Sequence, residues 1–391
     1  MKDIQISSSF LLLLGTLLAS LGYGATFLLS DYIKICGGAS DDVGFAFASA
    51  MIGTFVGVPC VGWLASKLNA IRLASIACLS ISFGFLLLSS ASYSVFILVN
   101  IAGFFIGLGW GMFYVGAPMG LSERISDQVR GLWFTRFGAF QMAGIGISPV
   151  VIHFLNTKLH ISLQICFLAL ALLVAGASLL LKIFNDKEPV TLKNHITHAW
   201  VTKLPKILRS VTVLPILMVC FGACAFSGLM SFQSSLVAGS SANPSMFFMV
   251  YAITTVFSRI ICAPFLTKIK PITLMFCLLT VMLIGIFAMF GVQSSALWQI
   301  ISAICVGAGY GLVYPIIQTW AINSSDEQDR HAVFTWFVLF YFVGVFGFPA
   351  VGSFLLKVGG SNMLLITLVI VVALEISCVI YGALRYKNIK G

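Results

Sequence analysis

A stretch in the second half of the chain repeats an earlier one at a distance of 200 residues. Residues 107–149 read GLGWGMFYVGAPMGLSERISDQVRGLWFTRFGAFQMAGIGISP, and residues 307–349 read GAGYGLVYPIIQTWAINSSDEQDRHAVFTWFVLFYFVGVFGFP. Aligned without a gap, the two copies are identical at twelve positions. Each copy has a glycine-patterned apolar segment, a short charged turn, and a second apolar segment that we expect to be broken near its end by proline. This duplication indicates a fold built from two similar halves.

The composition of the chain places those halves in a membrane. Of 391 residues, 60% are hydrophobic and only 9% are charged. A soluble protein of this length could not bury that much apolar surface, whereas a bilayer can. The ten cysteines fall almost entirely inside apolar runs and match no metal motif or disulfide framework, so we expect neither a metal site nor a cofactor. The net charge of +10 would suggest nucleic acid in a soluble protein, but here we expect no nucleic-acid partner.

Hydropathy over a window of about 19 residues predicts twelve transmembrane helices and an all-α integral membrane fold. The predicted helices span residues 10–30, 43–65, 71–90, 95–119, 133–154, 161–184, 211–237, 246–265, 272–292, 298–322, 333–356 and 363–384. We therefore expect an N-terminal six-helix bundle over residues 1–184, a cytoplasmic linker over 185–210, and a C-terminal six-helix bundle over 211–391. The first apolar run has no convincing cleavage site, so we interpret it as a helix rather than a signal peptide.

The distribution of basic residues predicts the orientation of these helices. If the N-terminus is cytoplasmic, the inner loops hold seventeen Lys and Arg residues and the outer loops only three, Lys34, Lys158 and Lys357. Loops rich in Lys and Arg stay in the cytoplasm. We therefore expect both termini inside, in the inner membrane of a bacterium.

The loop after the second predicted helix connects the chain to a known family. Residues 62–72 read GWLASKLNAIR, which resembles the G-x-L-x-D-R-x-G-R-K signature of the major facilitator superfamily. Ser66 replaces the acidic residue of the signature, so the latch that this acid forms in the family is not expected here. The resemblance covers the whole chain. It implies two pseudo-symmetric six-helix bundles that rock about a midplane solute site, giving access from one side of the membrane at a time.

The predicted function is secondary active transport of a small organic solute, coupled to protons. The chain has no GxxxxGK[ST] segment for ATP and no HExxH or GxSxG motif, which disfavours an ATP-driven pump and a membrane enzyme. Residues 144–149, GIGISP, are similar to a glycine-proline motif of the superfamily's antiporters, which slightly favours export. The alternative is a proton-coupled importer, a symporter of a small metabolite or an anionic nutrient. In either case we expect a monomer in the lipid bilayer.

Four charged residues in or at the edge of the predicted spans are candidates for a role in transport, because charge is costly there. Arg259 is predicted near mid-depth, either binding an anionic solute or donating to backbone carbonyls of a neighbouring helix. Arg136 either reaches the cytoplasmic interface or projects toward solute. Glu375 and Asp31 are the candidate proton-coupling acids. The alternatives are a protonated structural carboxyl for Glu375 and an exposed loop acid for Asp31.

Aromatic and amide side chains on the helices that line the cavity in this family are further candidates for solute binding. Amphipathic aromatic rings suit a solute of mixed polarity, although helix packing explains many such residues equally well. The candidates are Tyr23, Trp110, Tyr114, Gln141, Tyr310, Tyr314, Gln318, Trp336 and Tyr341.

Small residues four positions apart predict close helix contacts. Gly103, Gly107 and Gly111 lie on one face of the fourth predicted helix, and Gly307 and Gly311 repeat two of them in the tenth. Faces of this kind allow helix backbones to approach closely. In the linker, His195 and His198 are interpreted as solvated residues, because no third metal ligand accompanies them.

Overall fold

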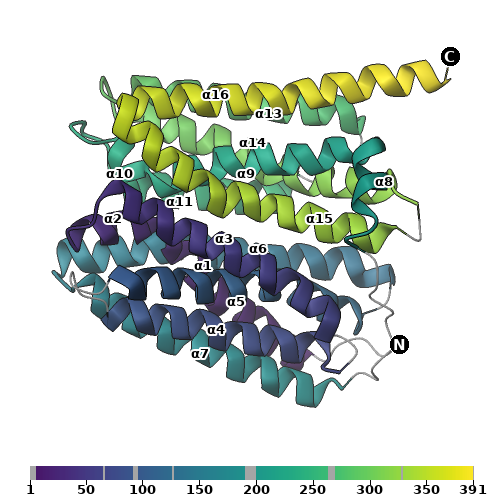
Figure 1. Ribbon diagram of the computed structural model, residues 1–391, viewed down its shortest axis with the longest axis horizontal. Helices are drawn as coiled ribbons and strands as arrows, with labels where there is room; N and C mark the ends of the chain where they lie inside the picture. The colour runs from purple at the N-terminus through teal and green to yellow at the C-terminus, as the bar shows by residue number, and fades with distance from the viewer. Residues whose placement is uncertain are drawn as a thin grey trace. The chain divides into compact units, whose positions relative to one another are not determined.

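The computed structural model describes residues 6–64, 67–90, 96–125, 127–189, 200–262, 269–326 and 329–390 (Figure 1). Every regular element in this part of the chain is a helix. Ten of its helical runs are long and apolar enough to cross a membrane, and Pro244–Phe257 is a shorter apolar helix. Ser66, His195 and His198, on which the sequence made predictions, lie outside the described residues.

The chain forms two compact units, Met1–Thr197 and His198–Gly391. Their boundary falls within the predicted linker. The two ends of that linker belong to different units. Helix α7 (Leu163–Lys187) continues into the start of the linker from the first unit, and helix α8 (Leu204–Arg209) at its end belongs to the second unit.

Unit 1 consists of long helices joined by short turns. Its elements are α1 (Ile6–Ala25), the 3-10 turn η1 (Thr26–Leu28), α2 (Leu29–Ile35), α3 (Ser40–Leu64), α4 (Ala70–Ser90), α5 (Phe96–Ser122), α6 (Asp127–Lys158) and α7 (Leu163–Lys187). The start of α7 has a clear local cause, since the Ser162 side chain caps it by accepting a hydrogen bond from the Ile165 N–H. Elements α1, η1 and α2 follow one another directly and form one candidate span, Ser8–Ile35.

Unit 2 has more interruptions than unit 1. Its elements are α8 (Leu204–Arg209), α9 (Val213–Ser231), α10 (Gln233–Leu236), α11 (Pro244–Phe257), the π-helix η2 (Ser258–Cys262), α13 (Pro271–Ala288), the 3-10 turn η3 (Met289–Gly291), α14 (Leu297–Asn323), α15 (Arg330–Phe342), the π-helix η4 (Val343–Gly347) and α16 (Phe348–Lys390). Within α16, Gly360 has the non-helical angles φ 66° and ψ −164° and divides the helix into two limbs. Only glycine adopts such a conformation without strain.

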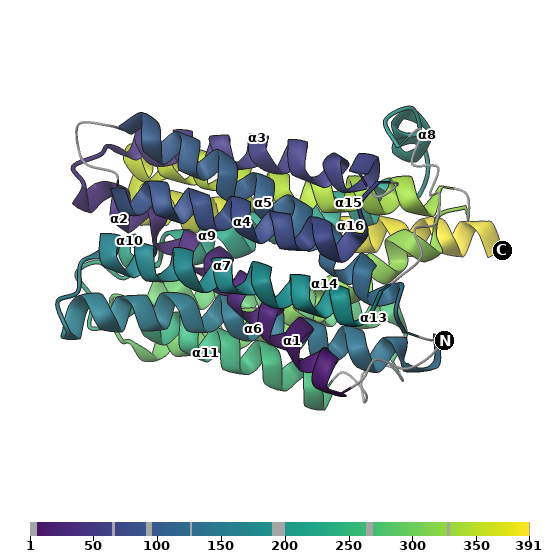
Figure 2. The same ribbon diagram turned by 90° about the horizontal axis from the view of Figure 1, so that it is seen from below.

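The helices of the two units pack in the same order. In unit 1, α3 contacts α5, α5 contacts α4, α4 contacts α7, α7 contacts α1, and α1 contacts α6. In unit 2, α11 contacts α14, α14 contacts α13, α13 contacts α16, α16 contacts α9, and α9 contacts η4 and α15. Figures 1 and 2 label the long helices of each unit. The repeat in sequence is therefore also a repeat in three-dimensional packing.

The repeated glycines lie at close helix contacts. A methyl group added at Gly107 would overlap the backbone of Ala50 on α3, and one at Gly307 would meet the Tyr251 carbonyl of α11. Glycine at these positions removes the atom that would hold the helices apart. The predicted close contacts are confirmed.

Prolines do not break the helices as the sequence suggested. Pro149 lies inside α6, which continues to Lys158, so the predicted break is wrong for the first copy of the repeat. In the second copy, Pro349 follows the π-helix η4 and α16 continues beyond it. Helices in a membrane tolerate proline because neighbouring groups and local π-turns satisfy the freed carbonyls.

The outward-facing surfaces of both units are apolar. Leu172 is 68% exposed on α7 and Ile253 is 60% exposed on α11, and many other large apolar side chains are similarly open. Such a surface is costly in water and favourable in hydrocarbon.

Candidate functional site

A stack of aromatic rings lies in the core of unit 1. Tyr23 of α1 stacks on Trp110 of α5 with the ring centroids 4.6 Å apart and the planes 5° apart. Trp110 also stacks on Phe113 at 5.5 Å and contacts the ring of Tyr114 at 6.2 Å. The structure thus brings together three of the predicted candidates, Tyr23, Trp110 and Tyr114.

Unit 2 contains a similar stack, in which the residues on the glycine-rich helix are at the repeat positions. Tyr310, the repeat partner of Trp110, stacks on Phe226 of α9 at 5.0 Å with the planes 10° apart. Tyr314 contacts Tyr310 at 6.2 Å and Tyr341 of α15 at 5.5 Å. Phe226 was not predicted, because one phenylalanine among 34 gives no signal in the sequence. In both units, therefore, an aromatic residue of the first long helix stacks on the glycine-rich helix.

Within each stack, the rings differ in how much of their surface is exposed. Tyr23 and Trp110 are 1% exposed, and Tyr310 and Tyr341 are 7% and 5% exposed. Tyr114 and Tyr314 are only half-buried. Buried rings held by stacking support a neighbouring ring that keeps part of its surface accessible. Each stack therefore ends in one amphipathic tyrosine ring, Tyr114 in unit 1 and Tyr314 in unit 2.

Arg259 binds a helix backbone at mid-depth in unit 2. Its Nε donates a hydrogen bond of 2.8 Å to the Gly311 carbonyl. Gly311 is fourteen residues from the start of α14, about 21 Å along the helix, so the side chain lies well inside the span. Arg259 is half-buried and belongs to the π-helix η2, whose wider turn reorients side chains.

Glu375 is completely buried in unit 2, with 0% exposure. Its two carboxyl oxygens have no hydrogen-bond partner among the described residues. A methyl group added at Gly222 of α9 would lie 3.1 and 3.2 Å from these oxygens and 3.1 Å from the Tyr310 ring. The carboxyl and the ring of Tyr310 therefore flank the same glycine, which places Glu375 beside the aromatic stack.

The remaining predicted residues are distributed along the helices. Asp31 is half-buried on α2 and interacts electrostatically with His153 of α6. Arg136 is exposed, and its guanidinium lies 5.2 Å from the centroid of the Trp133 ring. Gln141 is 8% exposed on α6 and Gln318 is half-buried on α14.

Trp336 does not join the aromatic stack of unit 2. Its Nε1 donates a hydrogen bond of 2.8 Å to the Trp200 carbonyl, and the two tryptophan rings are 5.1 Å apart. Trp336 therefore contacts the segment before α9, residues 200–209, which is called the docking segment below. Figure 1 shows α8, the helical part of this segment, beside the start of α15.

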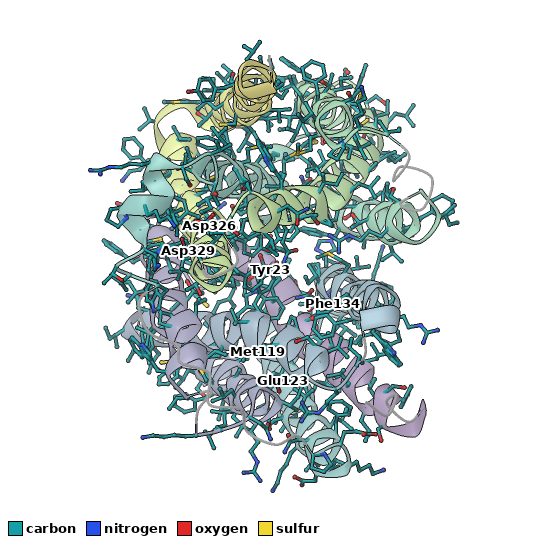
Figure 3. The ribbon with its side chains drawn as sticks, turned by 90° about the vertical axis from the view of Figure 1, so that its right-hand side faces the viewer. Tyr23, Met119, Glu123, Phe134, Asp326 and Asp329 are labelled. Atoms are coloured by element: carbon teal, nitrogen blue, oxygen red, sulfur yellow. The ribbon has the colours of Figure 1, made fainter. Side chains whose placement is uncertain are left out.

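Ion pairs attach the docking segment to the charged turn between α14 and α15. Lys203 Nζ lies 2.8 Å from Asp329 Oδ1, and Lys206 binds both Asp329 and Asp326, the latter at 2.7 Å. Figure 3 shows Asp326 and Asp329 close together at this end of the unit. Hydrogen bonds from Lys203 and Lys206 lower the pKa of Asp329, and those to Asp326 and Asp329 raise the pKa of Lys206. The Asp329 side chain is 6% exposed, so these ion pairs are more than a solvated surface contact.

The equivalent turn of unit 1 is held by a buried arginine. Arg124 donates from Nε to the Glu188 carbonyl and from Nη1 to the Gly120 carbonyl, both at 2.8 Å, and from Nη2 to Asn185 Oδ1 at 3.0 Å. Burial lowers the pKa of Arg124, while the nearby Glu123 and Glu188 oppose the shift. Both copies of the charged turn are thus tied to a polar segment of their own unit.

The described residues contain no group of three or more His, Cys, Asp or Glu side chains that could hold a metal ion. The cysteines that are described have free thiols.

Two apolar helical units with the same packing order, each with an aromatic stack in its core, indicate a multi-pass membrane protein. The family model described as Major Facilitator Superfamily matches residues 12–349. The chain therefore belongs to the Major Facilitator Superfamily, and the family indicates a transporter rather than an enzyme. No curated protein sequence matches the chain.

Solved structures of distant sequence share the fold. The POT family transporter PepTSo has a TM-score of 0.77 at 12% identity, with 98% of each chain covered. The nucleoside transporter NupG has a TM-score of 0.72 at 13% identity, with 97% of this chain and 99% of that chain covered. An auto-inhibited POT family peptide transporter has a TM-score of 0.71 at 11% identity, with 97% of each chain covered.

Proposed function

We propose that the chain is a secondary active transporter that moves a small organic solute by alternating access, coupled to protons. In this proposal twelve transmembrane helices form two six-helix bundles, both termini lie in the cytoplasm, and the protein works as a monomer in a bacterial inner membrane. The solute site opens to one side of the membrane at a time.

The observation that carries the proposal is the matched pair of aromatic stacks. Trp110 and Tyr310 are repeat partners, and each stacks on an aromatic residue of the first long helix of its unit. Each stack ends in a half-buried tyrosine, Tyr114 or Tyr314. Phenol rings of this kind combine an apolar face with a hydroxyl, which suits a solute of mixed polarity. We therefore assign Tyr114, Tyr314 and their supporting rings to solute binding.

Proton coupling rests on the acids in the membrane-spanning part of the chain. Glu375 is buried beside Tyr310, and Asp31 is half-buried near His153. Acids within membrane spans are typical of proton relays in transporters. We favour export by antiport, because the GIGISP segment of α6 is similar to the antiporter motif of the superfamily.

A proton-coupled importer of an anionic nutrient is the alternative, and Arg259 is the observation that favours it. A half-buried guanidinium at mid-depth would attract a carboxylate or phosphate group of a solute.

Counterflow in proteoliposomes tests the transport proposal without assuming a driving force. Vesicles with the purified chain would be loaded with one member of a panel of unlabelled amphipathic aromatic and anionic solutes. Uptake of the same labelled solute would then be measured. The proposal predicts transient accumulation for at least one solute, and Tyr314→Ala should reduce it. Phe354→Ala, which removes a side chain that is 59% exposed, serves as the matched control and should transport normally. If no solute accumulates, the proposal fails.

A further inference from the structure

The position of Glu375 can be compared with its counterpart in the other unit. Gly22 of α1 and Gly222 of α9 are 200 residues apart in the repeat. A methyl group added at Gly22 would meet the Val174 side chain of α7 at 3.3 Å, and one at Gly222 would meet the Glu375 carboxyl of α16 at 3.1 Å. Because α7 and α16 occupy the same place in the packing order, Glu375 stands where unit 1 has valine.

The equivalent position of unit 1 shows that helix packing does not require an acid at this place. Val174 is fully buried and fills its site in unit 1 with apolar atoms alone. A valine would thus satisfy the helix contact in unit 2 as well, and it would avoid the cost of burying a polar group without hydrogen bonds. An acid at this position requires an explanation other than the fold.

The surroundings of Glu375 favour its neutral, protonated form. The ionisable side chains that face it are Cys220 and Cys224 of α9, Tyr310 of α14, and Cys378 of its own helix. The only ionisable side chain of α13 is Cys277, which is exposed. Among the described residues no salt bridge reaches Glu375. A buried carboxylate without a cation or hydrogen-bond donor is strongly unfavourable, whereas a carboxylic acid is not.

Depth and neighbours connect this acid to the aromatic stack. Glu375 is fifteen residues beyond the Gly360 kink, about 22 Å along the second limb of α16, so it lies near the middle of the span. The carboxyl and the Tyr310 ring both lie beside Gly222, and the ring is stacked on Phe226 and contacts Tyr314. Charge developing on Glu375 would demand water or a donor at this contact, and the α9–α14–α16 packing would have to open to supply it.

We infer that Glu375 is the proton-binding site of unit 2. It keeps its proton while α9 and α14 pack around it, and it releases the proton when the packing between α9, α14 and α16 opens. The release step breaks the carboxyl O–H bond, leaves the electron pair on the carboxylate and transfers the proton to water. The inference rests on the proposed function, since it names the group whose proton binding is coupled to solute transport.

Infrared spectroscopy of the purified protein tests the inference without a known solute. A protonated carboxylic acid has a C=O stretching band that an ionised carboxylate lacks. Wild-type protein at neutral pH should show this band, and Glu375→Gln should lose it. In heavy water the band should shift to lower frequency, because a proton-binding site exchanges with solvent. A band that persists in Glu375→Gln would overturn the assignment. A wild-type band that never shifts would identify a sealed structural acid and also overturn it.

Two further variants control for folding and for other acids. Glu375→Val introduces the residue that unit 1 has at the equivalent position. The variant should therefore fold, keep the Tyr310–Phe226 stack and lose the band. Asp329→Asn removes an acid that is ionised in its ion pairs with Lys203 and Lys206, and it should leave the band unchanged. Loss of the band in Asp329→Asn would contradict the assignment to Glu375.

Transport measurements distinguish this inference from the proposed function. Glu375→Gln should retain counterflow of a transported solute and lose its acceleration by a pH gradient. Counterflow in wild type together with an unchanged gradient response in Glu375→Gln would remove Glu375 from coupling and leave the transport proposal intact. Absence of counterflow in wild type would reject the transport proposal, and with it the coupling role that rests on it.

Discussion

The Arg259 side chain donates its Nε–H to the carbonyl oxygen of Gly311 at 2.8 Å, which joins η2 to α14 within unit 2. In unit 1, Gly111 is the repeat partner of Gly311, and the backbone of Val58 lies beside it. Thr54 and Thr255, which contact these glycines, are 201 residues apart, and so are Val58 and Arg259. Both ionisable mid-span residues discussed for unit 2, Arg259 and Glu375, thus stand where unit 1 has valines.

Arg259→Val should therefore separate stability from function. The valine already occurs at this position in unit 1, and the Gly311 carbonyl lies within α14. We expect the free energy of unfolding to change by no more than about 1.5 kcal/mol. If Arg259 binds an anionic group of the solute, the apparent affinity should fall by about tenfold to a hundredfold. Thermal unfolding and counterflow would be measured together. Normal affinity in the folded variant would assign Arg259 to the helix contact alone.

The repeated glycines should differ in their sensitivity to alanine. A methyl group at Gly107 overlaps the backbone of Ala50, whereas at Gly307 the nearest atom, the Tyr251 carbonyl oxygen, is 3.0 Å away. Backbone atoms cannot move aside without shifting a helix. Gly107→Ala should destabilise the protein by about 1–3 kcal/mol, and Gly307→Ala should cost less. Gly176→Ala is the control, because nothing lies within 4 Å of the added methyl group. Equal loss of thermal stability in all three variants would contradict the packing described above.

Removing one acid should release the docking segment. Asp329 binds both Lys203 and Lys206, while Asp326 binds Lys206 alone among the described residues and is 73% exposed. Asp329→Asn should therefore increase amide hydrogen exchange in residues 200–209 far more than Asp326→Asn, with the exchange of α9 little changed in both. Similar exchange in the two variants would show that the Trp200–Trp336 contact holds the segment without the ion pairs.

The same ion pairs should withstand a broad range of pH. The pKa of Asp329 is lowered in the folded protein, so its contribution is present above its unfolded value of about 3.9 and is lost as pH falls through the lower folded value. The pKa of Lys206 is raised, so its contribution is present below about 10.4 and is lost as pH rises through the higher folded value. Hydrogen-exchange protection of residues 200–209 should stay constant between about pH 5 and 9. A step near neutral pH would point to another group.

Arg124→Lys should destabilise unit 1 although it keeps the charge. Lysine cannot reproduce the three hydrogen bonds of the guanidinium to the Glu188 and Gly120 carbonyls and to Asn185. We expect a loss of about 1.5–3 kcal/mol in the free energy of unfolding. Arg209→Lys, at an exposed position of α8, should have almost no effect. The transition measured by thermal unfolding would shift downward only in the first variant, and equal shifts would refute the role of Arg124.

The helical fold and the repeat could be read from the sequence because both depend on regular patterns. Apolar runs of span length predict helices, and identities at a constant offset predict that Gly107 and Gly307 make equivalent contacts. The helix ends were less predictable. The predicted fifth helix, residues 133–154, was too short at both ends, since α6 runs from Asp127 to Lys158. Polar residues at a membrane interface can extend a helix without adding any hydropathy signal.

The candidate site was only partly accessible to sequence reasoning. Tyr23, Trp110 and Tyr114 are brought together, as are Tyr310, Tyr314 and Tyr341, because their helices are neighbours in the packing order. Trp336 instead contacts Trp200, and that contact depends on where the docking segment folds back. Phe226 could be assigned to the stack only from its contacts in the structure. The valine counterparts of Arg259 and Glu375 could also be identified only in this way, since they are 201 residues away and the sequence repeat has an offset of 200.

The most direct test of the account is solute flux in proteoliposomes under an imposed pH gradient. A solute found by counterflow would be followed in vesicles with an acidic interior, an acidic exterior or no gradient. Proton coupling through Glu375 predicts that a gradient drives net accumulation, that reversing the gradient reverses its direction, and that Glu375→Gln abolishes the response. Export by antiport predicts that solute moves against the proton flow. Flux of the same size with and without a gradient would contradict proton coupling.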